Sequence, residues 1–231
     1  MGRRSSRVRP SCCGDSAQYT KSVDVAKRRR VNGPLGQSEH HKLPLVMSLN
    51  AALPEWALRV LMTPTHAYHS GDILRLLSPR AMGGPLRADT SARGAATLLL
   101  LHMGLYALQE CGVVHNDVYH NTLVAPLSSI VVFDARLPDA RGRVRPCVVS
   151  VERGVGWPRV FDFGAIYEKK RCVADALELA CKAVIYNRDG GEREDRAMKL
   201  LIAANQPNAG WGRTLSLLRL WAAPFVSVTF E

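Results

Sequence analysis

The sequence lacks any run of about 20 apolar residues, the length that a helix needs to cross a bilayer. It has no CxxC pair, and its six cysteines show no zinc-site spacing. His66 and His69 are three residues apart, as zinc ligands can be, but no cysteine or second histidine pair stands at partner spacing. No apolar segment of the signal-peptide type opens the chain. These absences disfavour a transmembrane protein, a zinc module and a disulfide-rich secreted protein. We therefore expect an intracellular protein, in the nucleus or the cytoplasm.

Positive charge is abundant and concentrated at one end. The chain has 31 Lys and Arg against 20 Asp and Glu, a net charge of +11. Residues 1–42 hold ten of these basic residues against three acidic ones, with few large apolar side chains, so we predict a basic, poorly ordered arm. Its run KRRR at Lys27–Arg30 is typical of a nuclear-import signal, a phosphate-binding patch or a solvated tail, which makes nucleic acid a candidate partner. The opening MGRRSS also fits the loose N-myristoylation pattern.

Apolar patterning beyond the arm predicts an α+β protein. LPLVMSLNAA and WALRVLMTP are short apolar runs that predict a strand pair, while SGDILRLLSP predicts a helix that stops before Pro79. A long helix is predicted over residues 92–110, capped by Asp89, Thr90 or Ser91. Because this helix is apolar nearly all round, it should be central and buried. Valine-rich strands follow, with a hairpin tip at LPDARGRV, and the chain ends in helices.

Polar residues interrupt the apolar sequence at two places after the long helix. The first is His115-Asn116-Asp117 with Asn121 close behind, and the second is Asp162-Phe163-Gly164. In this order they resemble the catalytic loop and the metal-binding motif of the protein-kinase superfamily, H-R-D-x-x-x-x-N and D-F-G. The non-catalytic alternative is that His115 and Asp117 cap the helix end and that the second motif is a turn.

The resemblance implies a protein-kinase-like fold with a reduced small β-rich lobe and a mainly helical large lobe. It also implies ATP and Mg²⁺ as cofactors and transfer of phosphate to a Ser or Thr hydroxyl of a protein substrate. Asp117 would orient the attacking hydroxyl, with His115 and His120 as further catalytic residues. Asp162 and Asn121 would be the metal ligands. The implied cofactor-binding residues are Lys27, Glu39, Met62, Asn121, Asp162, Phe163 and Gly164.

The outer parts of the resemblance set the expected domain boundaries. Residues 43–231 would form the kinase-like domain, with a remnant small lobe and hinge strand at 43–63. The large lobe would span 64–231 and carry an inserted hairpin at about 129–158. Met62 to Pro64 would line the adenine pocket, and Lys27 would be the phosphate-binding lysine. The last implied roles are Glu39 as the ion-pair partner of Lys27 and Asp175 as the brace of the catalytic loop.

Several family features are missing or altered. No A-P-E follows the second motif, and no glycine-rich loop precedes the first. If the following strand is aligned with the family, Thr122 takes the place of the metal-binding asparagine and Asn121 stands one residue early, while Tyr119 replaces a lysine. Asp134, in VVFDAR, is a rival metal ligand. The alternative function is therefore a pseudokinase that acts as a binding module. The compactness resembles kinases of large DNA viruses.

Overall fold

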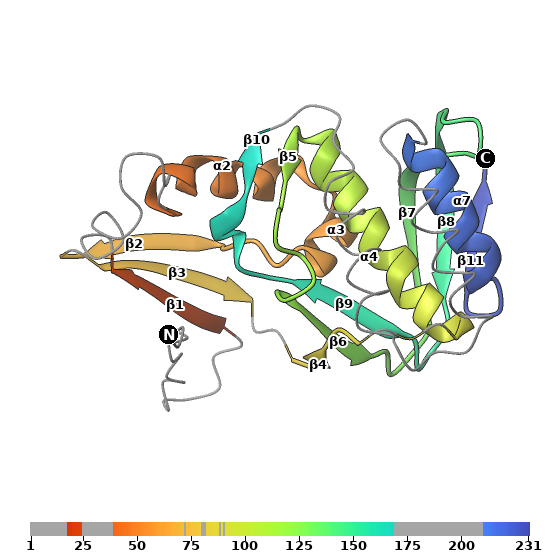
Figure 1. Cartoon of the computed structure of the whole chain (residues 1–231), viewed down its shortest axis with the longest axis horizontal. Helices are drawn as coiled ribbons and strands as arrows, with labels where there is room; N and C mark the ends of the chain where they lie inside the picture. Colours follow the sequence, from red (N-terminus) through yellow and green to blue (C-terminus); the bar gives the residue numbers. More distant parts are fainter. Residues whose placement is uncertain are drawn as a thin grey trace, which may run out of the picture.

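The computed structural model describes residues 18–24, 39–71, 73–79, 82–87, 89, 91–168 and 210–231 of the chain. It confirms the α+β class: a small antiparallel sheet lies at one end, and a larger part built around a long helix lies at the other (Figure 1). Among the helices of the described residues, none is long and apolar enough to cross a membrane. Lys27–Arg30 and Asp175 lie outside the described residues.

The small lobe is a three-stranded antiparallel sheet of order β1-β3-β2 with helix α2 against it. A two-residue connection that begins at Gly71, with φ of 61°, joins β2 to β3, as hairpin turns of this length require. Leu74 is fully buried, and Leu43 of α2 packs against it, so this lobe has a small apolar cluster of its own. The bounds are β1 Gln18–Asp24, α2 Glu39–Ala52, β2 His66–Ser70 and β3 Ile73–Pro79.

Two expectations for this region are wrong, and a third is corrected in part. Residues 18–24, inside the expected poorly ordered arm of residues 1–42, form the paired strand β1, while residues 1–17 and 25–38 lie outside the described residues. The predicted strand pair is instead helical, in α2 and in α3 (Glu55–Val60). The predicted helix before Pro79 is β3. Short apolar runs do not distinguish helix from strand by themselves, and β3 gains backbone pairing on both edges, which overrides the helix propensity of its leucines.

The long helix α4 (Ala92–Glu110) is the centre of the larger part, as predicted. Ser91 caps it, because the Ser91 hydroxyl accepts a hydrogen bond of 3.1 Å from the Gly94 backbone N–H. Its residues 94–108 are all buried. Gly104 lets α3 approach closely, since a Cβ there would lie 2.7 Å from Cγ1 of Val60.

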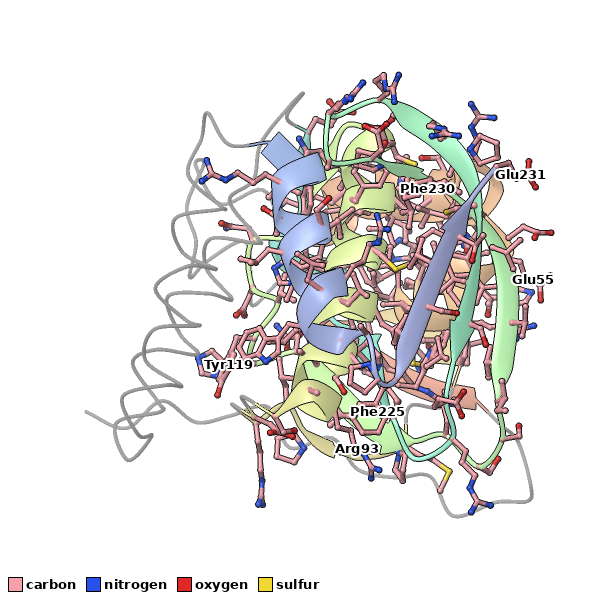
Figure 2. The ribbon with its side chains drawn as sticks, turned by 90° about the vertical axis from the view of Figure 1, so that its right-hand side faces the viewer. Glu55, Arg93, Tyr119, Phe225, Phe230 and Glu231 are labelled. Carbon is pink, nitrogen blue, oxygen red and sulfur yellow. The ribbon has the colours of Figure 1, made fainter. Side chains whose placement is uncertain are left out.

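Two further three-stranded sheets flank α4. The first has the order β4-β6-β9, and the second, β11-β8-β7, contains the hairpin expected between the two motifs. The hairpin is completed by β11 from the end of the chain, which the sequence did not predict, and α7 lies beside it (Figure 2). The bounds are β4 Gly84–Pro85, β6 Thr122–Pro126, β7 Val131–Pro138, β8 Val144–Val151, β9 Gly156–Val160, α7 Gly210–Ala222 and β11 Val226–Phe230.

Candidate active site

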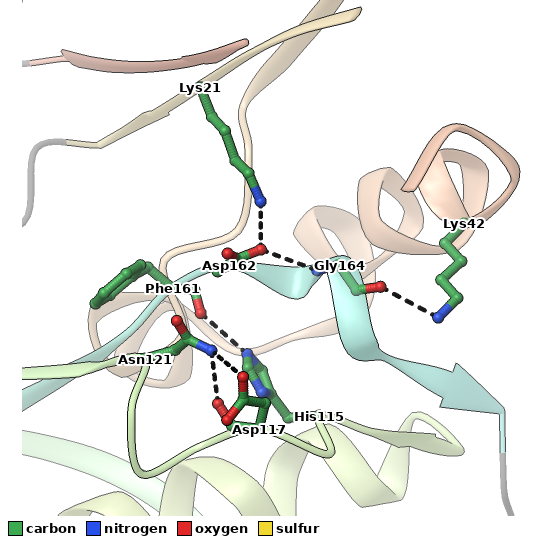
Figure 3. Close-up of polar contacts among 8 residues, drawn as sticks. All are labelled: Lys21, Lys42, His115, Asp117, Asn121, Phe161, Asp162 and Gly164. Carbon is green, nitrogen blue, oxygen red and sulfur yellow. Dashed lines mark hydrogen bonds and ion pairs between the residues drawn. The ribbon is translucent and has the colours of Figure 1, made fainter. Parts of the chain in front are cut away.

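The two motif loops are held together by strand pairing on both sides. Before the first loop, β5 (Val113–Val114) pairs with β10 (Tyr167–Glu168), which follows the second loop. After the first loop, Thr122 of β6 pairs with Val160 of β9, which precedes the second. Both loops therefore emerge at one edge of the larger part, facing the small lobe (Figure 3).

His115 joins the two loops from the inside. Its side chain is fully buried, and its Nε2 lies 3.1 Å from the carbonyl oxygen of Phe161. A carbonyl only accepts, so Nε2–H is the donor. The ring also packs edge-to-face on buried Phe163, with centroids 4.9 Å apart. His115 thus links the two loops by one hydrogen bond and one ring contact.

Asn121 holds the side chain of Asp117, the acidic residue of the first loop. The Asn121 side-chain nitrogen donates 2.9 Å hydrogen bonds to both the backbone carbonyl and the Oδ2 of Asp117. Because two acceptor oxygens surround this nitrogen, the amide oxygen of Asn121 must point the other way. In Figure 3 that oxygen lies on the side of Asn121 that faces Asp162.

Thr122 is directed away from the site. Its hydroxyl donates a 2.7 Å hydrogen bond to the Val118 carbonyl, and its side chain is buried. Of the two candidates for the metal-binding amide position, Asn121 is therefore the residue whose side chain lies beside Asp117.

Asp162 stands at the start of a three-residue 3₁₀ turn, η1 (Phe163–Ala165). Its Oδ1 accepts a hydrogen bond of 3.3 Å from the Gly164 N–H, which caps the turn. Asp162 has a φ of 60°, and Asn116 in the other loop has 66°; among the described residues these are the two non-glycine residues with positive φ. Such backbone costs about 1–3 kcal/mol and is held only where the surroundings dictate it.

The residue that meets Asp162 from the small lobe is Lys21, on β1. Its ammonium forms an ion pair with Oδ1 of Asp162 (Figure 3). The side chains are 19% and 35% exposed, so the pair is only partly shielded from water. The sequence does not single out Lys21, because it is one of ten basic residues within 1–42. The available signal was the pattern of Tyr19, Lys21 and Val23, alternating with small polar residues, which is typical of a strand.

The pKa of Asp162 lies below its ordinary value. Burial is the largest single effect and would raise this pKa, but the Lys21 charge, the hydrogen bonds from Lys21 and Gly164 and the charge of His115 together outweigh it and lower the pKa. Asp162 is therefore a carboxylate at neutral pH, ready to hold a cation.

The remaining predicted cofactor residues fare differently. Lys27 lies outside the described residues, and Glu39 begins α2, with a side chain that the structure does not describe. The hinge expected at Met62 to Pro64 is wrong, because this segment precedes β2 and β3, and residues 80–91 connect the small sheet to α4. Met62 is buried, and its N–H donates to the Val160 carbonyl at 2.8 Å.

Two further candidates have exposed side chains. Asp134, the rival metal ligand, is exposed on β7 opposite Val148, so its assignment as the metal ligand is wrong. His120 is exposed, and its ring packs edge-to-face on Tyr119, with centroids 5.4 Å apart. A catalytic role for His120 stays a prediction.

The oxygen donors at the site suit Mg²⁺. This ion prefers carboxylate and amide oxygens and is commonly held by one or two carboxylates together with substrate phosphates. Asp162 offers the carboxylate, and Asn121 offers the amide oxygen. Within the part of the chain that the structure describes, no group of three or more His, Cys, Asp or Glu side chains is arranged to hold a metal ion.

Comparisons with known proteins add little to this geometry. No protein family matches the chain, and no curated protein matches it. Among solved structures, the chain is similar to a crystal structure of PF14_0431, kinase domain, with 13% sequence identity and a TM-score of 0.44. The match covers 81% of this chain and 54% of that one, so the chain spans about half the length of that kinase domain. At this degree of likeness, function has to be argued from the two loops and from Lys21.

Proposed function

We propose that this protein is an ATP- and Mg²⁺-dependent phosphotransferase that acts on a Ser or Thr hydroxyl of a protein. The observation that carries the proposal is the approach of three segments distant in sequence. Lys21 of the small lobe pairs with Asp162, and strand pairing and His115 join the loop of Asp117 and Asn121 to the Asp162 loop. Phosphoryl transfer needs this set, because catalysis rests on positioning and charge neutralisation.

Each side chain has a role that follows from its contacts. Asp117, held by Asn121, accepts a hydrogen bond from the attacking hydroxyl and takes its proton. The hydroxyl oxygen bonds to the γ-phosphorus of ATP while the bond from that phosphorus to the bridging oxygen breaks and ADP leaves. Lys21 offers its ammonium to the phosphate oxygens, for which it exchanges Asp162. Asp162 and the Asn121 amide oxygen would hold Mg²⁺, which when bound neutralises phosphate charge.

Nucleotide binding is the first test. Ligand at about 100 times its dissociation constant adds about 2.7 kcal/mol of stability. ATP with Mg²⁺ should therefore raise the melting temperature of the wild type by several degrees, and the Lys21→Met variant should respond weakly. No shift in the wild type would overturn the proposal, since neither a kinase nor a nucleotide-binding pseudokinase would remain.

Transfer separates an enzyme from a binding module. The wild type should move the label from γ-labelled ATP to a protein acceptor such as casein, or to itself. Asp117→Asn should keep the ATP-dependent shift and lose transfer by about 10²-fold or more, as expected on removing a catalytic base. A wild type that binds ATP and Mg²⁺ but transfers nothing would instead make the protein a pseudokinase.

A further inference from the structure

A second small-lobe lysine reaches the turn that carries Asp162. Lys42, in the first part of α2, donates a hydrogen bond of 3.2 Å to the carbonyl oxygen of Gly164 (Figure 3). Lys21 contacts the other end of the same turn, at the Asp162 carboxylate. Two cations from different elements of the small lobe thus hold both ends of residues 162–164.

The contact on Gly164 matters because the turn is strained and short. Asp162 has a left-handed backbone, and the turn is closed by the 3.3 Å bond to the Gly164 N–H and a 3.5 Å bond from Ile166 N–H to the Phe163 carbonyl. Both are long for hydrogen bonds between these atoms. The Lys42 bond is charge-assisted, and such bonds are roughly twice as strong as neutral ones. It fixes the direction of the peptide that follows Gly164.

Lys42 also connects this turn to the core of the small lobe. The next residue, Leu43, packs against fully buried Leu74 of β3. Lys42 therefore joins the apolar cluster of the small lobe to the end of the Asp162 turn.

We infer that Lys42 is a positioning residue that orients the Asp162 turn for metal binding through its hydrogen bond to the Gly164 carbonyl. The inference rests on the proposed function for its metal. Because Lys42 acts by donating a hydrogen bond to a backbone carbonyl, this positioning role requires no acidic residue on α2.

The test compares Lys42→Met, Lys42→Arg and the wild type. Loss of a group that orients a metal ligand typically costs 10–100-fold in metal affinity. Lys42→Met should therefore raise, by about tenfold or more, the Mg²⁺ concentration that half-saturates the ATP-dependent thermal shift. Lys42→Arg, which keeps a cationic donor, should restore most of the affinity. Arg59→Met is the matched control, because Arg59 is an exposed cation on α3 paired with Glu55, and it should leave the Mg²⁺ dependence unchanged.

A second readout needs no ligand. Amide hydrogen exchange of the peptide covering residues 161–168 should be faster in Lys42→Met than in the wild type, with Lys42→Arg close to the wild type. Unchanged exchange and unchanged Mg²⁺ dependence in Lys42→Met would overturn the inference. A wild type without any nucleotide response would refute the proposed function, and the exchange measurement would still decide whether Lys42 holds the turn.

Discussion

Removal of Lys21 tests how strongly the two lobes are coupled at Asp162. An exposed ion pair contributes up to about 1 kcal/mol, whereas breaking a fully buried pair costs about 3–5 kcal/mol. The Lys21 and Asp162 side chains are 19% and 35% exposed, so their pair lies between these limits. Because the Asp162 side chain is partly exposed to water, the cost should fall below that of a buried pair. We expect Lys21→Met to lower the free energy of unfolding by about 2 kcal/mol at pH 7.

A double-mutant cycle isolates the pair. Urea unfolding of Lys21→Met, Asp162→Asn and the double variant should give a coupling free energy of about 1–2 kcal/mol at neutral pH. The pKa of Asp162 is lowered in the folded state, so its contribution is full above the unfolded value of about 4 and is lost as pH falls through the folded pKa. Strictly additive variants at pH 7, with coupling below about 0.3 kcal/mol, would refute the reasoning.

Three more predictions concern α4 and its surroundings. Burial lowers the pKa of His102 to about 4, below the unfolded value of about 6.5, so the melting temperature should fall as pH drops between these values, and a His102→Leu variant should lose that dependence. Ser91→Ala removes the cap of α4 and should cost about 1 kcal/mol in urea unfolding, whereas Ser91→Thr should cost much less. Gly156→Ala would place a Cβ 2.4 Å from Cγ1 of Val124 and should cost about 1–3 kcal/mol, partly recovered by adding Val124→Ala; no recovery would place the strain elsewhere.

The parts of the fold that could be predicted have strong local signals. α4 is long, apolar on every side and capped by Ser91, and each of these features predicts the same buried helix. The hairpin of β7 and β8 has valine-rich strands on either side of a turn-forming segment. The two motifs are short, and the structure brings their loops together through the pairing of β5 with β10 and of β6 with β9.

The parts that could not be predicted depend on distant pairing. β3 is a strand because β1 and β2 pair with it on both edges, while its sequence ILRLL is equally typical of a helix. Lys21 has no local motif, and its contact with Asp162 depends on the distant pairing of β1 with β3. Whether Asn121 or Thr122 faces the site was undecidable from spacing alone, because one residue of slack in the loop exchanges them.

The central claim, that Asp117 and Asp162 carry out Mg²⁺-dependent phosphate transfer, is tested most directly by measuring transfer in the wild type and in matched Asp→Asn variants. The claim predicts label transfer from ATP by the wild type with Mg²⁺, none in EDTA, and transfer reduced by about 10²-fold or more in Asp117→Asn and in Asp162→Asn. Asp134→Asn should transfer as the wild type does, since Asp134 is exposed on β7 away from the two loops. Full transfer by Asp117→Asn or Asp162→Asn, or loss of transfer in Asp134→Asn, would contradict the assignment of the site.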